Sequence, residues 1–356
     1  MQSTITVKVE KTKQSHLGDI DFKQLEFGKT PADHMFISEY QQGEWHNPRI
    51  QPYGNIIFTP FSLALHYGQT VFEGMKAFRM DDGNISIFRL DKHYERFSKS
   101  LERMCMPLVP RNLFEEAMAA VVEVDYAWVP EDENSSLYMR PFMVASESRL
   151  GVKVSEEYLF LIVSSPVGSY YSKPLKVKVE TEFVRAAEGG VGFAKCGGNY
   201  GSAFYPTKMA KEQGFDQVLW TDSRKNEYLE ESGTMNVVFF FDEVLVTPPL
   251  STSILDGVTR DSIITLAKDM GIATEQRDIS IVELEQRLKE GSVKEAFGAG
   301  TAAVVAPIDL IGIGDRRYNV PVKEDAKMFT FKKLLSDIRH GRTADKHGWN
   351  HVVKIN

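Results

Sequence analysis

The sequence predicts an α+β protein with two domains. Its 356 residues exceed the length that one hydrophobic core usually organises, so two domains are expected. Stretches in which apolar and polar residues alternate, as in strands, lie between stretches with the spacing of amphipathic helices. Clusters of Gly, Pro, Asn and Asp separate these stretches and mark turns.

The first half of the chain mixes strands and helices. A strand is predicted at residues 85–88, and Asp91 then begins a helix. One face of this helix carries the apolar residues Tyr94, Phe97, Leu101 and Met104. The other elements predicted here are a short edge strand at residues 7–9, a helix at 113–124, and buried strands at 137–144 and 158–164.

The second half begins after residues 166–174, where Pro, Gly and paired Tyr residues predict a crossover between domains. We expect a smaller N-terminal domain at residues 1–170, a connecting loop at 171–178 and a larger C-terminal domain at 179–356. The elements predicted beyond the crossover are an alternating strand at 175–180, a helix after the Gly-rich segment 189–201, strands at 217–220, 237–241, 244–247 and near 295–297, and helices after Gly257 and at 324–338.

Composition limits the classes of function. The formal net charge of -7 argues against a nucleic-acid partner, because such proteins usually carry a basic surface. Two cysteines, Cys105 and Cys196, are too few for a disulfide framework or a zinc ribbon, so we predict no metal site. No apolar run reaches the roughly 18 residues of a membrane span, and no signal pattern opens the chain. We therefore expect a cytoplasmic enzyme with no membrane partner, and we interpret the mixed charges of residues 332–351 as a solvated helix face and a terminal segment.

The Gly-rich segment is the most unusual part of the sequence, because one Lys, Lys195, stands among six glycines. A phosphate-binding P-loop requires Gly-Lys-Ser/Thr, but Ala194 and Cys196 flank this Lys; a dinucleotide fingerprint requires Gly in its place. Two interpretations stay open: a Lys that forms a Schiff base with a flat cofactor, and a structural loop with a solvent-facing Lys. A nucleophilic Cys196 is disfavoured, since no His lies near it in the sequence.

Three further segments offer partners for a cofactor. Glu230 and Glu231 precede the turn at Gly233, either in a solvated loop or, with pyridoxal-5'-phosphate, as the carboxylate that keeps the pyridine nitrogen protonated. Thr301, in a Gly-Thr turn, and the helix start at 256–260 each offer N–H groups to an anion. Each signal is weak alone, and together they provide the two contacts that a cofactor phosphate needs.

Two arginines are candidates for anion binding. Arg96 lies within the first predicted helix, where it either faces solvent or has a functional role. Tyr138 and Arg140 share one face of a predicted apolar strand. This pair indicates either a carboxylate site or an Arg with a partner at a subunit interface.

These residues together resemble the branched-chain aminotransferases, the fold-type IV group of pyridoxal-5'-phosphate enzymes, and most closely the larger form that includes the mammalian enzymes. The resemblance runs from Phe27 to about Trp349. The motifs that carry it are Leu65-His-Tyr67, Phe72-Glu-Gly-Met-Lys-Ala-Phe78, Tyr138-Met-Arg140-Pro141, the segment from Lys195 to Gly201, Gly233-Thr-Met-Asn236 and Gly300-Thr-Ala302. It implies a barrel-like sheet in the C-terminal domain and a homodimer.

The resemblance also implies a role for each matching residue. Lys195 resembles the Schiff-base Lys, Tyr200 the partner of the cofactor's phenolic oxygen, and Glu231 the carboxylate on the pyridine nitrogen, with Glu230 as second choice. The remaining residues that would bind the cofactor are Arg96, Thr234, Val258, Thr259 and Thr301. The residues that resemble the substrate pocket are Phe27, Tyr67, Phe72, Tyr138, Arg140, Val152, Tyr170, Thr234, Thr301 and Ala302, with Val152 reaching into the partner subunit's site and Arg140 taking the side-chain carboxylate of glutamate.

Two positions depart from the family pattern. The mammalian enzymes carry a redox-sensitive Cys pair after the Gly-Thr-Ala turn, but Ala303 and Ala306 stand here, so we predict no thiol switch at this place. Thr259 stands where an apolar residue is more usual. Little consequence is expected, because the backbone N–H of this residue would bind the phosphate.

The implied reaction is a two-step transamination between leucine, isoleucine or valine and 2-oxoglutarate, with amino acids and 2-oxo acids as the partners. Lys195 would remove the Cα proton of the substrate. A D-amino acid aminotransferase or an aminodeoxychorismate lyase would use the same Lys, and a cofactor-holding protein without turnover is the rival from another class. The apolar pocket and the pair Tyr138 and Arg140 favour the branched-chain enzyme.

Overall fold

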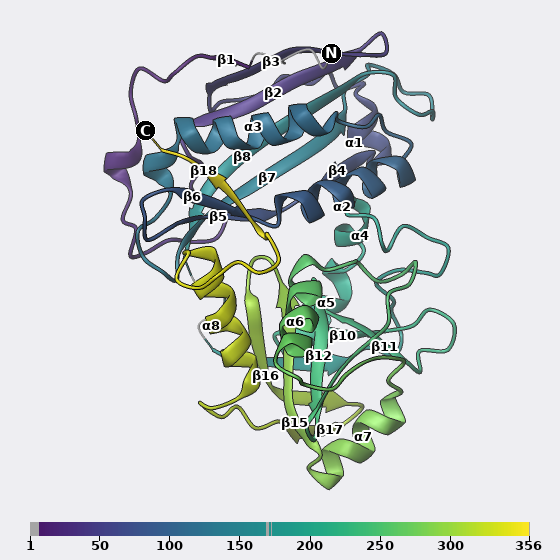
Figure 1. Ribbon diagram of the computed structural model, residues 1–356. Helices are drawn as coiled ribbons and strands as arrows, with labels where there is room; N and C mark the ends of the chain where they lie inside the picture. The colour runs from purple at the N-terminus through teal and green to yellow at the C-terminus, as the bar shows by residue number, and fades with distance from the viewer. Residues whose placement is uncertain (1–6, 169–170, 172, 356) are drawn as a thin grey trace. The chain divides into compact units, whose positions relative to one another are not determined.

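The computed structural model describes residues 7–168, 171 and 173–355. The chain forms two compact units, Met1–Tyr170 with Ser336–Asn356, and Tyr171–Leu335. Each unit has its own sheet and its own core, and Figure 1 labels most of the elements of both.

The first unit is built on a sheet of nine strands among the described residues. The strands follow the order β1-β3-β2-β8-β7-β5-β6-β18, and β4 pairs with β7. Every pairing is antiparallel except that of β1 with β3. Their bounds are β1 (Lys8–Val9), β2 (His34–Gln41), β3 (Glu44–Pro52), β4 (Thr70–Phe72), β5 (Met75–Arg79), β6 (Ile85–Phe88), β7 (Ser136–Ala145), β8 (Tyr158–Val167) and β18 (Asn350–Val353).

Helices α2 (Leu90–Arg103) and α3 (Arg111–Val124) pack on this sheet, and Figure 1 shows α3 lying across β7 and β8. Both were predicted from their apolar spacing, and both predictions are confirmed. The apolar face of α2 buries Phe97, whose ring lies 5.9 Å from that of Phe160 on β8. A short helix, α1 (Leu63–Tyr67), and turns of 3-10 helix at Leu17–Asp19 and Tyr126–Trp128 complete the unit.

The end of the chain belongs to the first unit, which corrects two expectations. Asn350–Val353 pairs with β6, and Trp349 is buried, so residues 336–356 do not pack with the C-terminal domain in which we placed them. The first unit then holds the larger share of the chain, whereas we expected the second to be larger. Lys332 and Lys333 are exposed on the helix face that we interpreted as solvated, but Arg339 is buried and stacks on the rings of Phe78 and Phe88.

The second unit contains a closed ring of six strands. The described order is β11-β10-β9-β16-β15-β12, and β11 also pairs with β12, which closes the ring. This is the barrel-like sheet that the resemblance implied. Its bounds, with the strands attached to it, are β9 (Leu175–Val179), β10 (Gln217–Thr221), β11 (Leu229–Ser232), β12 (Met235–Phe241), β13 (Val244–Thr247), β14 (Thr274–Gln276), β15 (Val293–Gly300), β16 (Val304–Ile313) and β17 (Arg316–Asn319).

Alternation along the strands builds the core of this ring. Leu175, Val177 and Val179 on β9 are buried, as the strict alternation of residues 175–180 predicts. They pack in one cluster with Val237 and Phe239 of β12. Because β9 begins at Leu175, the last residues of the connecting loop that we placed at 171–178 are strand instead.

The helices of the second unit cover the outside of its sheet. Contacts join α5 (Phe204–Glu212) to β10, and α6 (Val258–Asp269) and α7 (Ile281–Glu290) to β15. A single turn, α4 (Gly198–Gly201), precedes α5, and α8 (Lys327–Arg339) begins in the second unit and ends in the first. In the part of the chain that the structure describes, no helix has both the length and the apolarity needed to cross a bilayer.

Candidate functional site

Lys195 lies in the loop that connects β9 to α4, and its side chain is half-buried. The Nζ atom lies 2.8 Å from the hydroxyl of Tyr200, which is on α4. Lys195 is therefore not the solvent-facing side chain of the structural alternative. The amine and the phenol form a polar pair in a loop whose glycines leave room beside it.

Asn199 orders this loop, and our sequence analysis did not identify it. Its side-chain amide is buried and donates to the carbonyls of Val191 and Ala194, each at 2.8 Å. A buried amide with two backbone acceptors fixes the residue before Lys195 in place. The position inside the Gly-rich segment was the available signal.

Glu231 lies on β11 and is buried, so the solvated-loop alternative is wrong. One carboxylate oxygen accepts from the N–H of Leu255 at 2.9 Å and from the amide of Asn236 at 3.1 Å. The other oxygen lies 2.8 Å from Nε of Arg185. Ion pairing and hydrogen bonds both favour the ionised carboxylate, so Glu231 presents a negative charge inside the second unit.

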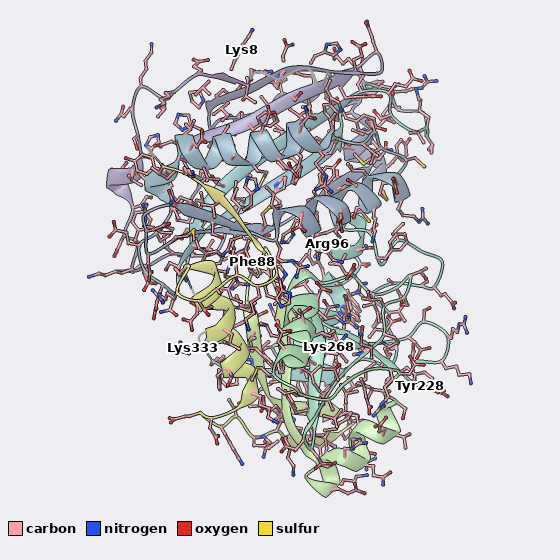
Figure 2. All side chains as sticks on the ribbon, in the orientation of Figure 1. Lys8, Phe88, Arg96, Tyr228, Lys268 and Lys333 are labelled. Carbon is pink, nitrogen blue, oxygen red and sulfur yellow. The ribbon has the colours of Figure 1, made fainter. Side chains whose placement is uncertain are left out.

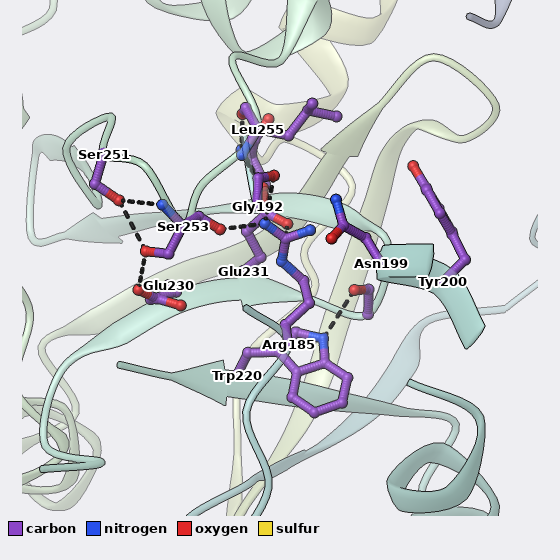
Figure 3. A network of polar contacts seen from close by, with 12 residues as sticks. Arg185, Gly192, Asn199, Tyr200, Trp220, Glu230, Glu231, Ser251, Ser253 and Leu255 are labelled. Carbon is purple, nitrogen blue, oxygen red and sulfur yellow. Dashed lines mark hydrogen bonds and ion pairs between the residues drawn. The ribbon is translucent and has the colours of Figure 1, made fainter. Parts of the chain in front are cut away.

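Arg185 connects this carboxylate to the lysine loop, as Figure 3 shows. Its Nη2 donates to the carbonyl of Gly192 at 3.0 Å and to the carbonyl of Ser253. The loop also contacts the same segment directly, because Phe193 N–H donates to the carbonyl of Thr252. One guanidinium thus joins β11, the loop that carries Lys195 and the segment that leads to α6.

Glu230 points to a different partner than Glu231 does. Its carboxylate accepts from the hydroxyl of Ser253, and the residue is buried. Burial raises the pKa of this carboxyl to about 7, although the hydrogen bond from Ser253 and the charge of Arg185 act in the opposite direction. Glu230, our second choice for the pyridine partner, therefore differs from Glu231 in both partner and charge.

The start of α6 and the turn after β15 lie on either side of Asn236. A Cβ on Gly257, which caps α6, would overlap the side-chain oxygen of Asn236, and the Cα of Asn236 pairs with that of Ala299. The first N–H groups of a helix have no acceptor within it, so those of Val258 and Thr259 suit an anion. The Gly-Thr turn, with Thr301 and Ala302, follows β15 directly.

The Gly-Thr-Met-Asn motif requires glycine at its first position, Gly233. Its φ is +57°, which favours glycine, and a Cβ there would overlap the side chain of Gln217. The tight turn allows β11 and β12 to pair, with Glu231 opposite Asn236. Thr234 lies exposed at its tip.

The predicted substrate residues of the first unit form an aromatic and cationic cluster. Nη2 of Arg140 donates to the hydroxyl of Tyr138 at 2.8 Å, which confirms that they share a face of β7. The guanidinium stacks 4.6 Å from the ring centroid of Phe72, and the ring of Phe27 lies 4.8 Å from that of Tyr138. A Cβ on Gly74 would overlap the Tyr138 hydroxyl, so this glycine makes the arrangement possible.

Arg96 is buried on α2, where Figure 2 labels it, so the solvent-facing alternative is wrong. Its Nε and Nη2 donate to Glu73 at 2.7 and 2.8 Å, and Nδ1 of His93 lies 2.8 Å from the same carboxylate. Burial alone would raise the pKa of Glu73, but Arg96 and His93 outweigh it and hold that pKa well below its usual range. Glu73 thus fixes the orientation of Arg96, a role that we did not predict although Glu73 lies in a recognised motif.

Tyr67 and Val152 are two further predicted substrate residues of the first unit. The hydroxyl of Tyr67 donates to the carbonyl of Leu150, near Val152, which is 80% exposed. Tyr170 lies outside the described residues.

The residues of the second unit suit pyridoxal-5'-phosphate. Lys195 supplies the amine that would carry it, Tyr200 a hydroxyl beside that amine, and Glu231 a buried charge for a pyridinium. The start of α6 and the Gly-Thr turn offer donors to a phosphate. Each donor type matches one polar group of this cofactor.

Comparison with known proteins gives the family. Residues 70–311 match the family described as amino-transferase class IV. Branched-chain-amino-acid aminotransferase 2 of Bacillus subtilis (strain 168) is 42% identical, over 99% of this chain and 98% of its own length. Branched-chain-amino-acid transaminase 1 of the same organism is 44% identical, over 92% and 94%.

The chain belongs to the branched-chain-amino-acid aminotransferase family. The family predicted from the motifs is confirmed, and so is the fold class. The branched-chain enzyme of Escherichia coli superimposes on this aminotransferase with a TM-score of 0.73 at 26% identity, over 91% of this chain and 99% of its own. The enzyme of Thermobaculum terrenum, solved in its PLP-form, shares the fold with a TM-score of 0.73 at 21% identity, over 90% and 98%.

Replacing Asn199 tests how the aminotransferase orders its lysine loop. Asn199→Ala removes both amide hydrogen bonds; the carbonyl of Val191 keeps the N–H of Ala194 as a donor, whereas the carbonyl of Ala194 loses its donor, which costs about 1–3 kcal/mol. We expect amide exchange across residues 189–197 to rise by about tenfold or more. Hydrogen–deuterium exchange with mass spectrometry measures this.

Ser202→Ala is the matched control, because the exposed Ser202 hydroxyl bonds only the carbonyl of Asn199 within the described part of the chain, at 3.2 Å. It should leave exchange in the loop near the wild-type rate. Equal exchange in all three proteins would show that Asn199 does not order the loop.

Proposed function

We propose that this aminotransferase transfers the amino group of L-leucine, L-isoleucine or L-valine to 2-oxoglutarate, giving the branched 2-oxo acid and L-glutamate. The proposal assigns pyridoxal-5'-phosphate to Lys195. The observation that carries it is the pair of Lys195 and Tyr200, in a loop joined through Arg185 to the buried Glu231.

Lys195 holds and moves the proton at the reacting carbon. When bound, pyridoxal-5'-phosphate supplies an electrophilic aldehyde and a ring that accepts the electrons released at Cα. The amine of Lys195 would then act as the base that takes the Cα proton of the substrate. Tyr200 lies within hydrogen-bond distance of that amine and orients it.

Glu231 would supply a negative charge to the pyridine nitrogen of the ring. Its negative charge, held by Arg185, Leu255 and Asn236, favours a protonated pyridine nitrogen. The phosphate is assigned to the N–H groups of Val258 and Thr259. Its other contacts are assigned to Arg96, Thr234 and the hydroxyl of Thr301.

One substrate pocket must accept an aliphatic chain and, in turn, a carboxylate chain. The rings of Phe27, Phe72 and Tyr138 supply apolar surface for leucine, isoleucine and valine. Arg140 supplies the charge for the second carboxylate of 2-oxoglutarate: its Nε is buried and has no hydrogen-bond acceptor among the described residues. The remaining residues assigned to the pocket are Tyr67, Val152, Tyr170, Thr234, Thr301 and Ala302.

The active form in this proposal is a cytoplasmic homodimer. Val152 supports this, because an apolar side chain that is 80% exposed in the single chain suits a surface covered by a second copy. Val152 then reaches the partner subunit's substrate, as the family resemblance implies.

An absorbance spectrum tests the function directly. The purified protein should show the visible band of lysine-bound pyridoxal-5'-phosphate, which L-leucine removes and 2-oxoglutarate restores. Lys195→Ala should show neither the band nor turnover. A colourless protein that takes up no added cofactor would refute the proposal. A coloured protein whose spectrum changes only with D-amino acids would instead be a D-amino acid aminotransferase.

Arg140→Met should separate the two halves of the reaction. Removing a charged hydrogen bond in a buried site costs about 1.5–3 kcal/mol, so kcat/KM for 2-oxoglutarate should fall by roughly 10- to 100-fold. Met retains apolar contact with Phe72, so kcat/KM for leucine should change by less than about threefold. Single-turnover kinetics measures each half separately, and equal losses for both substrates would contradict the assignment.

Mixed dimers test the shared site. Lys195→Ala and Val152→Asp subunits, co-expressed with different tags, should each be impaired alone. The isolated mixed dimer should recover activity, because one of its two sites combines the native Lys195 with the partner's native Val152. A stable mixed dimer without recovery would show that the sites do not share Val152.

A further inference from the structure

Glu230 is a buried acid that the proposed chemistry does not use. It lies on β11 beside Glu231 and is 7% exposed. One of its oxygens accepts from the hydroxyl of Ser253, and the other, Oε2, has no hydrogen-bond partner within residues 7–168, 171 and 173–355. A buried, unpartnered carboxylate oxygen is costly when charged, so its retention calls for a role.

Ser253 is the link between Glu230 and the rest of the site, as Figure 3 shows. Its hydroxyl binds Glu230 and also lies 2.9 Å from the hydroxyl of Ser251. Its carbonyl accepts from Arg185, the same guanidinium that pairs with Glu231.

The lysine loop also rests on this serine. A Cβ on Gly192 would overlap the backbone of Ser253, so the two segments touch with no room for a side chain. A shift of Ser253 would therefore move both the loop that carries Lys195 and the partner of Glu231.

We propose that Glu230 is a positioning residue that holds a proton: through Ser253 it keeps Arg185 against Glu231, and losing that proton weakens the hold on pyridoxal-5'-phosphate. The inference rests on the proposed role of Glu231. It adds a second carboxyl to the site, neutral where Glu231 is charged.

The charges around Glu230 support a neutral acid. The pKa of Glu230 is raised to about 7; burial is the largest cause, and the neighbouring carboxylates Glu231 and Asp222 act in the same direction. Ser253 and Arg185 lower it. An ionised Glu230 would place a second negative charge near the one Arg185 that Glu231 already occupies.

The pKa of Glu230 is raised from its ordinary value of 4.5, so the folded protein binds this proton more tightly than the unfolded chain. The contribution of protonated Glu230 to the free energy of unfolding is at its full value below about pH 4.5 and falls as the pH rises toward 7. The affinity for pyridoxal-5'-phosphate should decrease as the pH rises past 7, because Glu230 then loses this proton.

Equilibrium dialysis of the full-length holoenzyme between pH 6 and pH 8.5 tests this inference. The dissociation constant for pyridoxal-5'-phosphate should rise by about fivefold to tenfold in the wild type. A difference of one unit between the pKa of Glu230 with the cofactor bound and without it corresponds to a tenfold change in cofactor affinity. Glu230→Gln keeps the hydrogen bond and cannot ionise, so this proton-linked rise should disappear. Glu230→Ala should bind the cofactor weakly at every pH, and Glu227→Gln, at an exposed neighbour, should follow the wild type.

Comparison of variants removes the titration of the cofactor's own groups, which is common to all of them. A Glu230→Gln variant with the wild-type pH dependence would overturn the inference and leave the proposed function intact. A wild type that binds no pyridoxal-5'-phosphate would refute the proposed function itself.

A second measurement needs no variant. An infrared difference spectrum of the wild type between pH 6 and pH 8.5 should show loss of a protonated-carboxyl stretch. A spectrum without this band would overturn the inference even if Glu230→Gln failed to fold.

Discussion

The buried ion pair of Glu231 and Arg185 is the contact on which the second unit's site depends. Arg185 reaches the carbonyls of Gly192 and Ser253, while Glu231 accepts from Leu255. One pair therefore joins a strand, the lysine loop and the approach to α6. Removing one partner of a buried pair costs about 3–5 kcal/mol, since the other charge stays buried alone. Loss of either residue would therefore disturb all three segments.

The barrel supplies the rigid frame for this pair. Pairing of β11 with β12 closes the ring and also sets Glu231 opposite Asn236. The same pairing brings the start of α6 to the site, because Gly257 packs on Asn236. Closure of the sheet and placement of the charge thus follow from one turn at Gly233, whose left-handed conformation suits glycine.

The sequence predicted those features that local patterns encode. The spacing of apolar residues placed α2, α3 and β13, and the motifs located Lys195 and Glu231. It missed α7, although Ser280 accepts from the N–H of Glu283 in the capping pattern that marks a helix start. It also missed β18, because mixed charge near the chain end resembles a solvated tail and pairing with β6 is a long-range contact.

The missed site residues share a physical reason. Arg185 lies in a polar stretch with no period, and only folding brings it to Glu231. Asn199 and Glu73 lie inside recognised motifs, but their partners are a backbone carbonyl and a buried guanidinium that no spacing reveals. The motifs in the sequence were enough to identify residues of the site such as Lys195 and Glu231. The hydrogen-bond and ion-pair partners that position these residues could be identified only in the structure.

The most direct test is the protonation state of the pyridine nitrogen, read by NMR with ¹⁵N-labelled pyridoxal-5'-phosphate bound to the full chain. We expect a protonated nitrogen at neutral pH in the wild type and an unprotonated one in Glu231→Gln. An unprotonated nitrogen in the wild type, or an unchanged signal in Glu231→Gln, would contradict the claim that the Glu231 charge organises this site.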